Sequence, residues 1–252
     1  MGADVSDTGA STVPGGPGGE MVVVGARFEE LDWQETAMGE LTLRRRTEPT
    51  LGVDIFEVKL GDEYLMSSLF TVAEEKLATL GLAATTGEGL DVLVGGLGLG
   101  YTAVTALADP VVGTLTVIDA LPAVIGWHKR LLLPVSDALV NDPRTTLVHS
   151  DFFAVMRAES TIRYDAILLD VDHSPRHQLD PSHAGLYEVA GLRSLAGHLN
   201  ADGVFALWSD DPPDAEFMER LGAVFGTTAA HVVDFDNPLT GGVSSNTVYV
   251  AR

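Results

Sequence analysis

Two kinds of segment alternate along the chain from Asp91 onward. Short apolar runs that are typical of buried strands are separated by helix-length segments. The apolar runs are DVLVG, TLTVID, TTLVHS, YDAILLD and GVFALWS, and the segments between them include YTAVTALA, PAVIGWHKRLL, FFAVMR, LYEVAGLRSLAGHL and AEFMERLGAVF. This alternation predicts an α/β fold of Rossmann-like type, with a mainly parallel sheet covered by helices on both faces.

The two ends of the chain carry different patterns. Between residues 22 and 68, the runs GELTLRRR, DIFEVKL and EYLM predict a small antiparallel β meander, and residues 71–80 predict a helix that leads into the main domain. At the other end, AAHVVDFDNP and NTVYVAR predict an antiparallel hairpin on the sheet edge. Residues 1–20 are rich in Gly, Ser, Pro and Asp, which predicts a disordered tail. The expected division is therefore a tail at 1–20, a small β domain at 21–70 and a Rossmann-like domain at 71–252.

Composition narrows the classes of partner and chemistry. The chain has 252 residues, 46% of them hydrophobic, which is enough for one principal core. The absence of cysteine excludes disulfides, a thiolate zinc site and a cysteine nucleophile. A net charge of -21 repels nucleic acid and favours cationic small molecules, or else solvates an exposed surface. Neither a signal-peptide pattern nor a long apolar run occurs, so we expect a cytoplasmic protein that does not bind membranes.

A glycine-rich turn follows the first apolar run. Gly95, Gly96, Gly98 and Gly100 lie between a predicted strand and a predicted helix, where glycines allow a tight turn and close approach of a ligand. Tyr101 occupies the place of the third glycine in the dinucleotide pattern, which weakens an NAD-dependent interpretation. The turn is a candidate nucleoside site, with a tight connection that binds no ligand as the alternative.

Acidic residues end the strands that follow. Asp119 is placed to accept hydrogen bonds from ribose hydroxyls, or to cap the next helix. Asp151 is placed to accept the amine of an adenine, with Phe152 near the ring; the alternatives are a helix cap and a core residue.

The most apolar run ends in the sequence DVDHSP. Asp170, Asp172 and His173 there form a candidate catalytic group for orienting an amine and accepting its proton, with a solvated acidic loop as the alternative. His177 and His183 lack the regular spacing of metal ligands, so we expect no metal.

Together these motifs resemble the spermidine synthase (polyamine aminopropyltransferase) family, which is built on the class I S-adenosylmethionine methyltransferase fold. The resemblance rests on GGLGLG, VIDALPAVIGW, NDPRTTLVHSDFF and YDAILLDVDHSP, and it spans roughly residues 39–252. It implies S-adenosylmethionine or its decarboxylated form as co-substrate, and an amine as acceptor. It also implies that Asp119 holds the ribose, that Asp151 faces the adenine and that Asp170 is the catalytic aspartate. The family often forms dimers or tetramers, so a homodimer is an expectation.

Two positions depart from the pattern of the family. Its loop usually reads GGGDGG, with the aspartate binding the amine of the aminopropyl chain, whereas this chain has Gly98 there. Its catalytic aspartate is usually followed by S-S/T-D-P, whereas Val171, Asp172 and His173 follow Asp170 here. Three hypotheses remain: an aminopropyltransferase, a small-molecule methyltransferase, and a binding homologue without activity.

Overall fold

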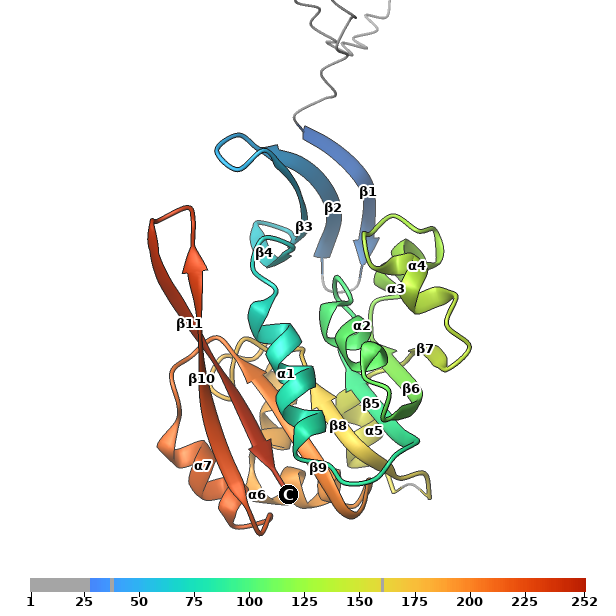
Figure 1. Ribbon diagram of the computed structural model, residues 1–252, viewed down its shortest axis with the longest axis vertical. Helices are drawn as coiled ribbons and strands as arrows, with labels where there is room; N and C mark the ends of the chain where they lie inside the picture. The colour runs from blue at the N-terminus through green and yellow to red at the C-terminus, as the bar shows by residue number, and fades with distance from the viewer. Residues whose placement is uncertain (1–27, 37–38, 160) are drawn as a thin grey trace, which may run out of the picture. The chain divides into compact units, whose positions relative to one another are not determined.

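A computed structural model describes residues 28–36, 39–159 and 161–252 of the chain. The predicted disordered tail at residues 1–20 lies outside the described residues. The chain separates into two compact units, one ending at Leu69 and the other running from Phe70 to Arg252. Figure 1 shows the elements of each unit.

The first unit is a four-stranded antiparallel sheet in the order β1-β2-β3-β4. Its strands are β1 (Phe28–Thr36), β2 (Gly39–Glu48), β3 (Val53–Leu60) and β4 (Glu63–Ser67). The predicted meander is confirmed, with the strand β1 added to the three expected runs. Charged side chains pair across it, because Glu57 accepts from the Nε atoms of both Arg44 and Arg46 at 2.8 Å.

The second unit is built on a seven-stranded sheet in the order β10-β11-β9-β8-β5-β6-β7. The parallel strands are β5 (Leu90–Gly95), β6 (Val112–Asp119), β7 (Thr145–His149), β8 (Tyr164–Leu169) and β9 (Leu199–Ser209). The antiparallel hairpin of β10 (Thr228–Asn237) and β11 (Gly242–Ala251) completes one edge. The predicted mainly parallel sheet with a C-terminal antiparallel hairpin is therefore confirmed.

Helices cover this sheet in two layers. Figure 1 shows α1 (Val72–Ala83) and α2 (Tyr101–Ala108) in front of the strands, and α5 (Phe152–Arg157) and α6 (Val189–Ala196) behind them. The remaining helical segments are α3 (Pro122–Lys129), α4 (Ser136–Val140), the 3-10 turn η1 (Pro181–Tyr187) and α7 (Ala215–Gly222). A core that includes Phe205, Phe217 and Tyr249 joins α5, α6 and α7 to the sheet. Burial of these large apolar side chains is the main force that holds the layers together.

The helix before the main sheet is longer than predicted. It runs from Val72 to Ala83 instead of 71–80, and its buried positions extend to Gly81 and Leu82. A Cβ atom on Gly81 would lie 2.6 Å from Leu168 Cδ2 and 3.2 Å from Ala206 Cβ, so only glycine lets α1 lie this close to β8 and β9. The helix α1 therefore brings its first turn to the carboxyl edge of the strands.

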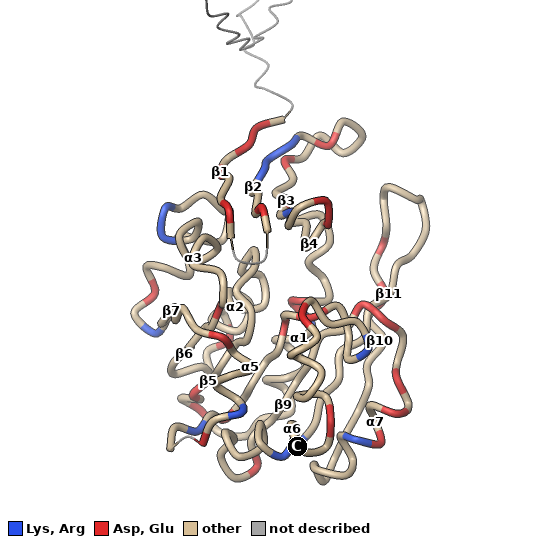
Figure 2. The backbone as a smooth tube through the Cα atoms, turned by 180° about the vertical axis from the view of Figure 1, so that it is seen from behind, with Lys and Arg blue, Asp and Glu red and all other residues tan. Residues whose placement is uncertain are grey.

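Acidic residues are spread over the whole described chain. Figure 2 shows acidic positions on many loops and strands, and a run of three basic positions, Arg44–Arg46, in β2. Among the described residues, no helix is long and apolar enough to span a membrane. The same residues hold no cluster of three or more side chains suited to a metal ion.

Candidate functional site

The glycine loop turns sharply between β5 and α2. Gly96, Gly98 and Gly100 have φ angles of 92°, 47° and 90°, a region that glycine adopts without strain. A Cβ atom on Gly96 would lie 2.0 Å from the carbonyl oxygen of Asp170, so the loop packs directly on the end of β8. Gly95 is buried in the sheet, where its carbonyl accepts the N–H of Asp170 at 2.8 Å. The glycine loop and Asp170 therefore lie side by side at the carboxyl ends of β5 and β8.

Asp119 closes the loop from the side of β6. Its carboxylate accepts the N–H of Leu97 at 2.9 Å and the N–H of Leu121 at 2.7 Å. Burial raises the pKa of this carboxyl, although the hydrogen bonds from Leu121, Leu97 and Gly98 oppose the shift. A carboxylate has about four lone-pair positions, so Asp119 keeps capacity for a ribose hydroxyl while it organises the loop. These residues fit the nucleoside part of an S-adenosyl-type ligand.

Asp170 lies at the end of β8 beside two residues from the helices in front. Thr102 of α2 donates its hydroxyl to Asp170 Oδ2 at 2.7 Å, and it also lies 3.3 Å from the backbone carbonyl of Glu74 in α1. Burial raises the pKa of Asp170 to about 6, and the bond from Thr102 opposes this shift. Burial together with the nearby Asp170 charge raises the pKa of Glu74 to about 8. At neutral pH the pair therefore carries one negative charge, on Asp170, while Glu74 keeps its proton.

Glu74 is the site residue that sequence reasoning missed. In the sequence, Val72, Leu77 and Leu80 fall roughly on one face of the predicted helix at 71–80, and Glu74 lies largely outside that face. In the structure the buried positions are instead Ala73, Leu77, Ala78, Gly81 and Leu82. Glu74 precedes Leu77, Ala78 and Gly81 by three, four and seven residues, which is the spacing of one helix face. That spacing was the available signal.

Asp172 occupies a different environment from Asp170. Only 1% of its surface is exposed, and its carboxylate accepts from Leu179 N at 2.8 Å, His183 Nδ1 at 2.8 Å and the Tyr187 hydroxyl at 2.7 Å. The ring of His183 stacks on Phe153 with centroids 3.6 Å apart. Asp172 therefore anchors the segment 172–187, and its position does not bring its carboxylate to solvent. The backbone carbonyl of His173, next to it, accepts the N–H of Asp210 at 2.7 Å.

Asp151 and Phe152 stand at the start of α5. Asp151 is the N-cap residue, since its side chain accepts the N–H of Ala154 at 3.1 Å, and half of its side chain stays exposed. The ring of Phe152 is only 3% exposed, and it fills the space beside Gly95, where an added Cβ would lie 2.6 Å from its Cδ2 atom. The structure thus gives Asp151 a helix-capping role and places Phe152 in the core, which are the alternatives that the sequence left open.

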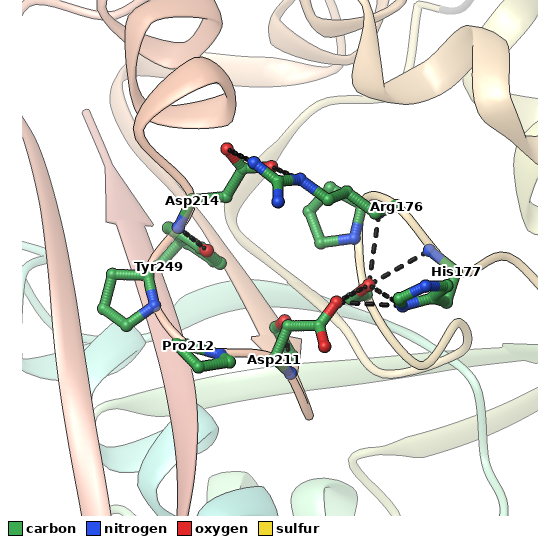
Figure 3. Close-up of a pocket in the computed structure, with 10 residues that line it drawn as sticks. Arg176, His177, Asp211, Pro212, Asp214 and Tyr249 are labelled. Carbon is green, nitrogen blue, oxygen red and sulfur yellow. Dashed lines mark hydrogen bonds and ion pairs between the residues drawn. The ribbon is translucent and has the colours of Figure 1, made fainter.

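A hollow lies where the loops after β8 and β9 meet (Figure 3). Its lining includes Arg176, whose guanidinium makes two bonds of 2.7 Å to Asp214, and His177, whose Nδ1 lies 2.9 Å from Asp211 Oδ2. Ser174 donates to the same Asp211 oxygen at 2.6 Å. In a hydrolytic triad the histidine stands between serine and aspartate, whereas here both bind one carboxylate oxygen. This arrangement does not support a serine nucleophile.

The fold is that of a class I methyltransferase-like α/β protein, and the glycine loop, Asp119 and Asp170 meet at the carboxyl edge of its sheet. A family model described as "Spermine/spermidine synthase domain" matches residues 71–218. Because this match covers more than half of the chain, the protein belongs to the spermine/spermidine synthase domain family, as the sequence motifs predicted.

Solved structures support the same fold. A spermidine synthase crystallised in complex with the transition state analogue AdoDATO is 18% identical, with a TM-score of 0.69, over 88% of this chain and 73% of that chain. A spermidine synthase from Thermotoga maritima is also 18% identical, with a TM-score of 0.67, over 88% of this chain and 71% of that chain. A search of curated proteins finds no match. At this level of identity the likeness confirms the predicted fold and leaves the chemistry to the side chains.

Proposed function

We propose that this protein is a transferase that moves an aminopropyl group from decarboxylated S-adenosylmethionine to an amine, with Asp170 as the proton acceptor. The observation that carries this proposal is that the glycine loop packs on the backbone of Asp170, whose carboxylate accepts from Thr102 and lies near Glu74. Membership of the family supports the reaction class. The spermidine synthase that binds AdoDATO has the same fold, which supports a related ligand here.

The residues present would divide the work between binding and proton transfer. Asp119 and the glycine loop would hold the ribose and orient the nucleoside. The sulfonium of the bound co-substrate supplies an electrophilic carbon: the amine nitrogen would form a bond to that carbon as its bond to sulfur breaks, and methylthioadenosine would leave. The protein has only to align the amine and take up its proton. Asp170 is suited to that role, because its raised pKa of about 6 leaves it ionised at neutral pH yet basic enough to accept a proton.

Glu74 would supply the carboxylate that the family's loop aspartate usually provides and that Gly98 lacks here. A cationic amine held in a partly buried site needs an anionic partner, since an unpaired buried charge costs several kcal/mol. Gly98 has no side chain to supply that partner, but Glu74 lies beside Asp170 in the same edge. An ammonium group bound there would favour the ionised form of Glu74 and give the pair two negative charges. The site would then hold a cationic tail or acceptor without the usual loop aspartate.

The experiment is an incubation of the purified protein with either decarboxylated S-adenosylmethionine or S-adenosylmethionine, together with a panel of amines, read by mass spectrometry. We expect an acceptor that has gained an aminopropyl group. Gain of a methyl group from S-adenosylmethionine would replace this proposal with a methyltransferase. Binding of the nucleoside without any product would indicate a homologue that has lost activity.

The role of Asp170 is tested by Asp170→Asn, which keeps the size of the side chain and its bond from Thr102. We expect turnover to fall at least about 100-fold, the usual contribution of a general base, while the affinity for methylthioadenosine changes little. Asp165→Asn, at the other end of β8, is the matched control and should keep most of the activity. Equal activity of Asp170→Asn and the wild type would remove Asp170 from the mechanism.

A further inference from the structure

A fully buried histidine stands behind the glycine loop. His128 is in the last turn of α3 and none of its surface is exposed. Its Nε2 atom lies 3.0 Å from the carbonyl oxygen of Gly98, and its Nδ1 atom lies 3.2 Å from the Ser136 hydroxyl. Burial lowers the pKa of this imidazole, so it stays neutral in the physiological range.

The partners of the ring fix where its single proton lies. A carbonyl oxygen can only accept, so Nε2 must carry the proton and donate it to Gly98. Nδ1 is then the acceptor, and the Ser136 hydroxyl donates to it. The Ser136 oxygen in turn accepts the N–H of Leu133 at 3.3 Å. This chain of bonds selects one tautomer and one ring orientation.

Gly98 is thereby held from both sides by one segment of chain. Its N–H bonds to Asp119 at the end of β6, and its carbonyl bonds to His128 in the helix that follows. The next glycine in the loop is also fitted to the ring, because a Cβ atom on Gly100 would lie 2.8 Å from His128 Cε1. In a trans peptide the carbonyl and the following N–H point in opposite directions, so the bond to His128 turns the Leu99 N–H away from the ring.

We infer that His128 is a positioning residue for ligand binding, which holds the Gly98 peptide so that the backbone of the loop is arranged before the ligand enters. This inference rests on the proposed function, since it assumes that the loop binds an S-adenosyl-type ligand. A loop with no side chain at residue 98 has more conformations to lose on binding than one with a substituted residue. The two hydrogen bonds of Gly98, one to Asp119 and one to His128, form a clamp on this peptide. The clamp restricts the loop before the ligand binds, which increases the affinity for the ligand.

The test compares His128→Leu with His128→Gln by calorimetric titration of methylthioadenosine and by hydrogen exchange of the amides in residues 96–100. Leucine removes the donor, so we expect affinity to fall about 10-fold and loop exchange to accelerate. Glutamine carries an N–H at a similar reach, so it should restore affinity to within about threefold of the wild type. Nitrogen NMR of the wild-type ring should show the proton on Nε2, a readout that needs no ligand.

Val124→Ala is the matched control for simple destabilisation, because Val124 is buried on the same helix one turn earlier. It should lower the melting temperature while affinity stays near that of the wild type. The inference is overturned if Val124→Ala weakens binding as much as His128→Leu, or if His128→Gln is no better than His128→Leu. A proton on Nδ1 would also overturn it. Failure of the wild type itself to bind methylthioadenosine would instead count against the proposed function, and loop exchange would still report on the clamp.

Discussion

At the scale of single residues, the environment of each carboxylate decides what it can do. Asp170 and Asp172 are two positions apart in one loop, yet Asp170 has a single hydroxyl donor beside a second carboxyl group, whereas Asp172 is surrounded by three donors. Asp172 is also only 1% exposed, so its carboxylate is not open to a substrate. Asp170 is therefore the better candidate for proton transfer, and Asp172 for holding the loop.

The hydrogen bond from Thr102 gives a direct test of Asp170 through the pH dependence of activity. This bond lowers the pKa of Asp170, and burial raises it to about 6, so activity should rise with pH through about 6 as the base ionises. Thr102→Val removes the bond. The rise of kcat/KM with pH should then occur about one pH unit higher, the shift expected from the loss of one hydrogen bond to a charge. Thr102→Ser keeps the hydroxyl and should keep the profile. A rise that does not move in Thr102→Val would show that another group titrates.

At the scale of elements, close backbone contacts make the site. The loop between β5 and α2 lies on the end of β8, and α1 lies on β8 and β9, in both cases through a glycine that leaves no room for a side chain. These contacts bring the first turn of α1 and the second residue of α2 to the same strand end. Neither glycine has a side chain that could react, but each sets the distances between groups that could.

Gly96→Ala tests this arrangement. The added Cβ would lie 2.0 Å from the Asp170 carbonyl, at a residue with a φ angle of 92°, so the loop must move. We expect a loss of about 3 kcal/mol of stability, from backbone strain and overpacking, and no measurable binding of methylthioadenosine. Gly126→Ala, in α3 with nothing within 4 Å of the added atom, is the control and should raise stability by ~0.5–1 kcal/mol. Full binding in Gly96→Ala, measured by calorimetry, would contradict this account.

At the scale of the whole molecule, excess negative charge and raised carboxyl pKa values both act on stability. The chain has 36 acidic and 15 basic residues, so self-repulsion grows as the carboxyl groups ionise. Asp170 and Glu74 add to this effect, because their pKa values of about 6 and about 8 exceed the ordinary values of 3.8 and 4.5. Through these two groups the folded state binds more protons than the unfolded chain between about pH 4 and pH 8, so their contribution to stability falls as pH rises through that window.

Glu74→Gln should remove its own part of this loss. The variant should match the wild type below about pH 4, where Glu74 is protonated in both the folded and the unfolded chain, and melt about 2–4 °C higher near pH 9, the shift that about 1 kcal/mol produces in a chain of this size. Thermal unfolding followed by circular dichroism at a series of pH values measures the difference. Glu75→Gln, at the neighbouring exposed position, should give a curve parallel to that of the wild type. The same parallel curve for Glu74→Gln would mean that Glu74 ionises normally.

The sequence by itself determined the order of the elements and the edge where the site lies. Apolar runs such as YDAILLD predict buried parallel strands, and the carboxyl ends of such strands share one edge, so Asp119 and Asp170 were placed together without coordinates. The glycine pattern likewise predicted the turn at Gly96 to Gly100. These features depend on neighbours in the chain, which is why local patterns are enough to find them.

Only the tertiary structure decided which polar groups meet. Several contacts of the site join different segments of the chain. Glu74 lies beside Asp170, His128 bonds to Gly98, and His183 and Tyr187 enclose Asp172. Each depends on how closely a helix approaches a strand, which is set by the packing of the whole core and by small residues such as Gly81. Burial and partners then fix pKa and tautomer, so the chemistry of these side chains follows from the packing.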